Sequence, residues 1–86
     1  MTVISVSSLR QAMLTVSDLK GLEIESFEEF GWYRNGFFYF GPNDNQPEGT
    51  PGWLVSQDGD VRKITWGDFH EIMEFIESPE TQVVHL

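Results

Sequence analysis

The sequence predicts an α+β domain in which two amphipathic helices pack on an antiparallel sheet of about five to six strands. Two hairpin signals support the sheet, because Asn35-Gly36 and Asp58-Gly59 each separate two runs of β-forming residues. Two apolar stripes with helical spacing, which start at Leu9 and Phe69, support the helices. At 86 residues the chain has room for one hydrophobic core, so we expect a single domain over residues 1–86.

Acidic residues dominate the charge balance, since 14 Asp and Glu stand against 5 Lys and Arg and give a formal net charge of −9. Such a charge repels nucleic acid and anionic membranes and attracts a basic partner, although solubility alone also explains it. No apolar run approaches the roughly 20 residues that cross a bilayer, and the N-terminus lacks a signal-peptide pattern. We therefore expect a cytoplasmic protein that binds neither nucleic acid nor membrane directly. The lack of cysteine excludes disulfides and thiolate metal sites.

The chain begins with a short expected strand over residues 2–6, which a helix follows. Ser8 fits the N-cap of this helix, Gln11 reaches back to complete a capping box, and Gly21 is a typical C-terminal stop. The apolar stripe of the helix consists of Leu9, Ala12, Met13 and Val16.

Residues 22–25 alternate in polarity, which predicts a strand with Leu22 and Ile24 facing the core. The alternation breaks over residues 26–29. A bulge or a bend is therefore expected just before the first hairpin strand.

An aromatic hairpin over residues 30–41 organises the expected sheet. Asn35-Gly36 fits a two-residue type I′ turn, which fixes the register as Arg34 opposite Phe37, Tyr33 opposite Phe38, Trp32 opposite Tyr39 and Gly31 opposite Phe40. Both faces are then aromatic, one with Phe30, Trp32, Phe37 and Tyr39, the other with Tyr33, Phe38 and Phe40. The hairpin is therefore either sandwiched between two layers or presents one aromatic face to a partner. If both helices cover one face, the other is left exposed.

A long loop and a second hairpin follow. Residues 42–52 contain three of the four prolines, which predicts an exposed loop, and loops of this length are often functional. Residues 53–55 and 61–65 form the strands of the second hairpin around an Asp-Gly turn at 57–60.

The second helix is the strongest helical signal in the chain. Thr65 fits its N-cap, with Asp68 as the acid at the third helical position, and Pro79 ends it. Its expected apolar stripe consists of Phe69, Ile72, Met73 and Ile76, with Trp66 one turn earlier. Residues 81–86 either close an edge of the sheet or fray.

No catalytic or metal-binding pattern in the chain is complete. The segment from His70 to Glu74 is a near match to a zinc-binding protease helix, but Glu74 stands where a second His ligand is required. Asn43-Asp44-Asn45 and Asp58-Gly59-Asp60 offer oxygen ligands without the spacing of a calcium loop. Ser56, His70 and Asp58 are the residue types of a hydrolytic Ser-His-Asp triad, but no nucleophile elbow supports it. We therefore expect no enzymatic activity, no metal site and no cofactor.

Two acidic groups point instead to partner binding. Asp68, Glu71, Glu74 and Glu77 run at i+3 spacing along the second helix, which has no Lys or Arg after its cap, and like charges at this spacing are unfavourable. Glu23, Glu25, Glu28 and Glu29 precede Trp32 and Tyr33, and carboxylates beside aromatic rings suit a protein interface. The expected partner-binding residues are Glu25, Glu28, Glu29, Trp32, Tyr33, Asp44, Glu48, Asp58, Asp60, Glu71 and Glu74. A solvated acidic face and aromatic rings that belong to the core are the open alternatives.

Three segments carry a family resemblance: Phe-Phe-Tyr-Phe-Gly-Pro at 37–42, Gly-Trp-Leu-Val-Ser-Gln-Asp-Gly-Asp-Val at 52–61, and Trp-Gly-Asp-Phe-His-Glu-Ile-Met-Glu-Phe at 66–75. Together they resemble the second half of small bacterial toxin-immunity proteins of the SUKH and YrhB-like kinds. The resemblance covers roughly residues 37–77 and implies a non-catalytic protein that binds and blocks a toxin domain encoded beside it. It assigns no binding residues in this chain.

Charge, aromatic content and the family resemblance lead to one hypothesis: this is a small acidic protein that binds and occludes a basic partner. The partner that fits best is a nuclease-type bacterial toxin. Two alternatives stay open. One is a nucleic-acid mimic, such as a phage anti-defence inhibitor, and the other is a structural domain that self-associates as a homodimer.

Overall fold

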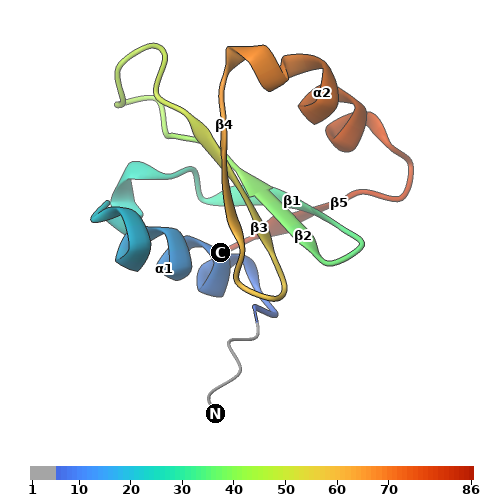
Figure 1. Ribbon diagram of the computed structural model, residues 1–86, viewed down its shortest axis with the longest axis horizontal. Coiled ribbons are helices and arrows are strands. Elements are labelled where there is room, and N and C mark those ends of the chain that lie inside the picture. Colours follow the sequence, from blue (N-terminus) through green and yellow to red (C-terminus); the bar gives the residue numbers. More distant parts are fainter. Residues whose placement is uncertain (1–5) are drawn as a thin grey trace.

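The computed structural model describes residues 6–86 (Figure 1). The strand expected over residues 2–6 therefore lies outside the described residues, apart from Val6. The elements in chain order are helix α1 (Leu9–Lys20), the 3₁₀ turn η1 (Ile24–Ser26), strands β1 (Phe30–Arg34), β2 (Phe37–Phe40), β3 (Gly52–Ser56) and β4 (Val61–Ile64), the 3₁₀ turn η2 (Trp66–Asp68), helix α2 (Phe69–Glu77) and strand β5 (Gln82–His85).

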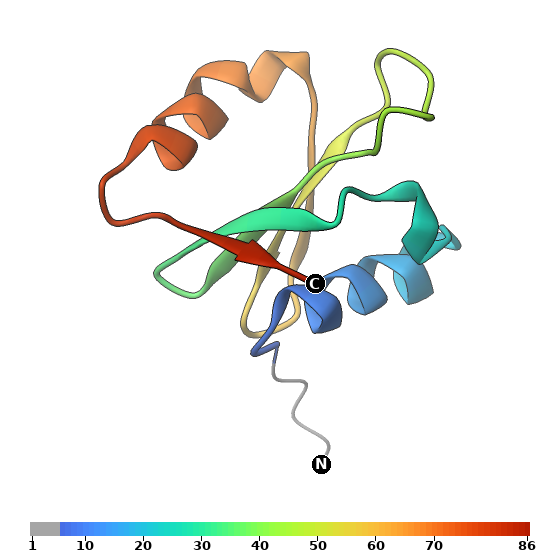
Figure 2. The same cartoon turned by 180° about the vertical axis from the view of Figure 1, so that it is seen from behind.

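The five strands form one antiparallel sheet in the order β4-β3-β2-β1-β5, which confirms the α+β class. Asn35 has φ 48° and Gly36 has φ 84°, as a type I′ turn requires. Three of the four expected pairs between β1 and β2 are present, namely Trp32 opposite Tyr39, Tyr33 opposite Phe38 and Arg34 opposite Phe37. The C-terminal segment does not fray, because β5 pairs with β1 at the edge of the sheet (Figure 2).

The sheet has two different ends. The turns of both hairpins, Asn35-Gly36 and 57–60, lie at one end, where the backbone N–H of Gln57 donates to the carbonyl of Gly36 at 2.8 Å. We call this the hairpin end. The opposite end, which we call the loop end, carries η1, the 41–51 loop between β2 and β3, and η2.

Helix α1 covers one face of the sheet, and its caps are those the sequence predicts. The Ser8 hydroxyl accepts from the Gln11 backbone N–H at 3.2 Å, and Gly21 ends the helix with φ 68°. The Gln11 side chain reaches one residue further back than expected and accepts from the Ser7 N–H at 2.7 Å. All four residues of the expected stripe are buried against the sheet residues Phe38, Phe40, Trp53 and Val55.

Helix α2 lies on the opposite face, so the aromatic hairpin is sandwiched between two helical layers (Figure 1). Because β4 and β5 are the two edge strands and run parallel to each other, the chain must cross the whole sheet between them. Five strands span about 19 Å, whereas a nine-residue helix is about 13.5 Å long. The helix therefore covers only part of this face.

The buried residues of α2 differ from the expected stripe. Ile72 and Phe75 are buried, whereas Phe69 is 50% exposed and Trp66 is 78% exposed. The apolar residues of α2 occupy more than one helical face, so the direction of the crossover decides which of them are covered.

The strand expected over residues 22–25 is wrong, because the chain forms η1 there. Its carbonyl groups bond to a loop distant in sequence: the side-chain amide of Asn43 donates to the Glu25 carbonyl, and the Asn43 N–H donates to the Ser26 carbonyl at 2.9 Å. Leu22 is 37% exposed rather than inward-facing. The expected bend before the hairpin is present at Glu29.

Candidate protein-binding surface

The loop end gathers carboxylates from two separate segments. Asn43 fastens the 41–51 loop to η1 through the two hydrogen bonds described above, and the Glu28 N–H donates to the Gly41 carbonyl at 3.0 Å. Five of the expected partner-binding residues lie at this end as a result: Glu25, Glu28, Glu29, Asp44 and Glu48. None of their carboxylates forms an ion pair within residues 6–86, and all but the half-buried Glu28 are exposed.

An aromatic pair that the sequence assigned to the core lies at the same end. Trp66 and Phe69 stack with ring centroids 6.2 Å apart, and both are exposed. Together with Gly49, Thr50 and Pro51 they line a shallow hollow of about 240 Å³ between α2 and the loop. The sequence does carry a signal for this pair, since five of the nine α2 residues are apolar and one stripe cannot hold them all.

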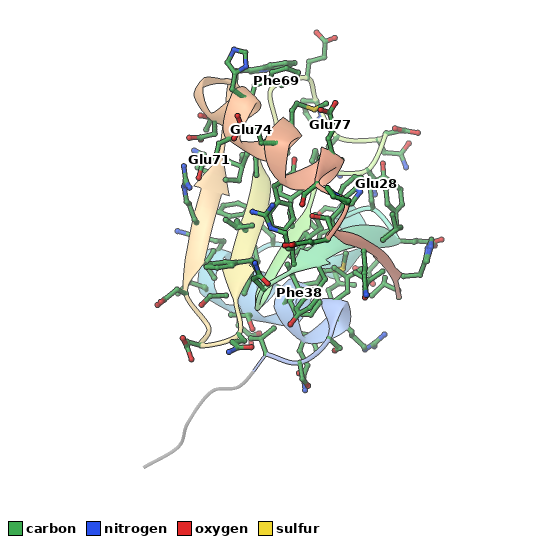
Figure 3. All side chains as sticks on the ribbon, turned by 90° about the vertical axis from the view of Figure 1, so that its right-hand side faces the viewer. Glu28, Phe38, Phe69, Glu71, Glu74 and Glu77 are labelled. Carbon is green, nitrogen blue, oxygen red and sulfur yellow. The ribbon has the colours of Figure 1, made fainter. Side chains whose placement is uncertain are left out.

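The acids of α2 are only partly free. Arg62 on β4 makes a two-pronged contact with Glu71, Nη1 to Oε1 at 2.7 Å and Nη2 to Oε2 at 2.8 Å, and Nη2 also reaches Asp68 Oδ1 at 3.0 Å. The helix has no cation of its own, but Arg62 on the neighbouring strand β4 compensates the first half of this acidic run. Glu74 forms no ion pair within the described residues. Figure 3 shows Glu71, Glu74 and Glu77 projecting from the helix.

Hydrogen bonds and charge shift three pKa values here. The backbone N–H of Thr65, 3.0 Å from Asp68 Oδ2, is the main cause that lowers the pKa of Asp68, and Arg62 adds to it. The hydrogen bonds from Arg62 lower the pKa of Glu71, and those same bonds raise the pKa of Arg62. All three groups are therefore charged at neutral pH.

Trp32 and Tyr33 do not form one aromatic patch, because neighbouring strand residues point to opposite faces. Trp32 lies on the α2 side, half-buried and stacked on Tyr39 with centroids 5.6 Å apart. Tyr33 lies on the α1 side against Phe38, with centroids 4.7 Å apart, and packs on the core. In Figure 3, Phe38 is seen on the side of the sheet that α1 covers.

Asp58 and Asp60 lie at the hairpin end, where they share a groove with Glu71 and Arg62. They border a groove of about 490 Å³ on the α2 side, whose apolar lining includes Phe37, Leu54 and Phe75. The guanidinium of Arg34 lies 5.0 Å from the centroid of the Phe75 ring and closes one side of this groove. The sequence-predicted acids therefore divide between the loop end and the α2 side, where Glu71 joins Asp58 and Asp60 at this groove.

The described residues contain no group of three His, Cys, Asp or Glu side chains arranged to hold a metal ion. Ser56 and Asp58 lie at the hairpin end, whereas His70 is exposed at the start of α2, so these three do not meet. Over residues 6–86, no helix is long and apolar enough to cross a membrane.

Comparisons of the chain with protein-family models, with curated proteins and with solved structures gave no significant match.

Proposed function

We propose that this protein is a non-catalytic binding domain that covers a basic partner with its loop end, and that the partner is a bacterial nuclease-type toxin. The observation that carries the proposal is that one end of the sheet carries both the exposed Trp66–Phe69 pair and five carboxylates that form no ion pair within the described residues. The resemblance of residues 37–77 to toxin-immunity proteins agrees with it.

The two features of the loop end have different roles in such an interface. Carboxylates attract a cationic surface over roughly a Debye length and raise the association rate. An exposed Trp offers large rigid area that slows dissociation once it is desolvated. Two lysines also lie at this end, because Lys20 and Lys63 line a hollow with Trp53, η1 and the 41–51 loop on the α1 side. The five acids outnumber these two lysines, so the loop end stays negative.

The nuclease class follows from charge complementarity. An enzyme that cleaves nucleic acid holds phosphates in a basic groove, and an acidic domain with a net charge of −9 fits such a groove. Covering the groove blocks access of the substrate without any chemistry by the inhibitor.

The test begins with the product of the adjacent reading frame, coexpressed and copurified with this chain. We expect a complex whose affinity falls by about tenfold or more between low and physiological salt. In the triple variant Glu25→Gln, Glu28→Gln, Glu29→Gln the association rate should fall about tenfold. The matched control Asp18→Asn, Asp58→Asn, Asp60→Asn removes the same charge elsewhere and should change it by less than about twofold.

Trp66→Ala tests the anchor separately and should speed dissociation by at least about tenfold. Leu19→Ala is its control, because Leu19 is a similarly exposed apolar residue on α1 (63% exposed). Affinity that does not depend on salt, or equal effects of each variant and its control, would overturn the proposal.

A further inference from the structure

The two edges of the sheet are protected to different degrees. Strand β4 carries Arg62 and Lys63, and charged side chains on an edge strand discourage pairing with another chain. Strand β5 has the sequence Gln-Val-Val-His, with no Asp, Glu, Lys, Arg or Pro, and Val83 is 56% exposed. In the part of the chain that the structure describes, no strand lies beyond β5.

The hydrogen bonds to β1 show which backbone groups of β5 point outward. The Leu86 N–H donates to the Glu29 carbonyl at 2.9 Å, so Leu86 faces β1. Backbone groups of an antiparallel strand alternate in direction, so Val84 also faces β1, whereas the N–H and C=O groups of Val83 and His85 point away from the sheet.

We propose that β5 pairs with β5 of a second copy of this chain, antiparallel, about a twofold axis perpendicular to the sheet. Such an axis keeps the α2 side of both copies on the same face. The register that uses the outward groups of both Val83 and His85 within β5 places Val83 opposite His85 of the partner subunit. The described strands of the two copies then form one ten-stranded sheet, and the free edges of that sheet are the two protected β4 strands.

Charge favours a second copy over a basic partner at this edge. Residues 81–86 contain no carboxylate side chain, so β5 itself presents no acid to a cationic strand, and the nearby acids Glu29 and Glu80 lie outside it. Two chains with a net charge of −9 each repel one another, and a neutral edge is where they can approach at the lowest cost. The pairing also covers Val83 and the His85 ring, which lies 6.4 Å from that of Phe30.

Proline substitution tests this geometry, because it removes one N–H without adding charge. Val83→Pro removes an outward N–H and no bond to β1. The matched control is Lys63→Pro on β4: the Ser56 N–H donates to the Asp60 carbonyl at 2.9 Å, so Lys63 also points its N–H outward by the same alternation.

Sedimentation of the full chain from about 10 µM to about 1 mM is expected to show the mass rise from 9.9 kDa toward twice that value. Val83→Pro should raise the dissociation constant of the dimer at least about tenfold, because both copies carry the substitution and each loses one hydrogen bond across the interface. Lys63→Pro should leave the dissociation constant unchanged. Val83→Lys, which keeps the backbone N–H and gives β5 the protection that β4 has, should also yield monomers.

Hydrogen exchange provides a readout that does not depend on any variant. The amides of Val83 and His85 should become protected as concentration rises, while the amide of Val84 is protected throughout by its bond to β1. A chain that stays monomeric at 1 mM, or that dimerises with these two amides unprotected, would overturn the proposal. So would a wild-type monomer whose binding to a basic protein is lost in Val83→Pro, since the edge would then serve that partner.

Discussion

The two faces of the sheet carry helices with comparable apolar content but very different packing. On the α1 side, Ala12, Met13 and Val16 are completely buried, and both ends of the helix are capped. On the α2 side, only Ile72 and Phe75 are buried, and a groove of about 490 Å³ remains beside them. The difference arises from connectivity, because α1 packs along its face whereas α2 must connect the two edge strands across the sheet.

This comparison teaches that one face provides stability and the other provides accessible surface. A closely packed face leaves few apolar atoms for a partner, whereas a helix that crosses diagonally leaves rings such as Trp66 in solvent. Substitutions on the two faces should therefore differ in their effects on unfolding and on binding.

The largest expected effect on stability comes from Phe40→Ala. Phe40 is completely buried on the α1 side and packs edge-to-face on Phe27 with centroids 5.0 Å apart. We expect urea unfolding to show a loss of about 3–5 kcal/mol. Phe37→Ala, the same change on the adjoining α2 side where Phe37 is 43% exposed, should cost about 1 kcal/mol or less. Equal losses would contradict the difference between the faces.

A smaller effect is expected for Phe75→Ala, which removes one of the two buried side chains of α2. The loss should be about 2–3 kcal/mol, because the neighbouring groove lets the surroundings relax. Native-state hydrogen exchange should show α2 amides opening well below the global unfolding free energy, with α1 amides exchanging only by global unfolding. If the amides of α1 and α2 exchange with the same free energy in the wild type and in Phe75→Ala, the two faces form one cooperative unit.

Gly31→Ala tests how much room the α1 side has. A Cβ at position 31 would lie 2.6 Å from the Tyr39 carbonyl oxygen and 2.9 Å from Leu9 Cδ1, so backbone would have to move. We expect a loss of about 1–3 kcal/mol in thermal or urea unfolding. Gly41→Ala is the matched control, since nothing lies within 4 Å of its added Cβ, and it should be neutral or slightly stabilising.

The elements that the sequence predicts correctly are those fixed by local chemistry. The Asn35-Gly36 turn sets its own register, and the Ser8 and Gly21 caps delimit α1. Residues 22–25 were mispredicted because their hydrogen-bond partner, Asn43, is 18 residues from Glu25, so no short window contains the interaction.

The candidate site was predictable in composition but not in arrangement. The acids and rings are visible in the sequence, yet Glu25 and Asp44 share one end of the sheet only because the 41–51 loop bonds to η1. Exposure of Trp66 depends on the path of α2, which follows from β5 pairing with β1 rather than from helical periodicity.

The smallest expected effect concerns the charges that hold α2 to β4. Arg62→Gln removes the bonds to Glu71 and Asp68, and we expect a small decrease in melting temperature at pH 7. The folded-state pKa values of both carboxyls are lowered, so their contribution is fully present above the usual carboxyl pKa of about 4 and is lost as the pH falls through the lowered values.

The difference in melting temperature between wild type and Arg62→Gln should therefore be constant from pH 7 to about 5 and vanish at lower pH, in thermal scans at fixed ionic strength. Lys63→Gln, one residue along the same strand and in no ion pair within the described residues, should show no such pH dependence. A difference that persists in acid would mean that Arg62 stabilises α2 through its aliphatic stem. Packing rather than charge would then hold α2 to the sheet, and lowering the pH would not destabilise α2 before α1.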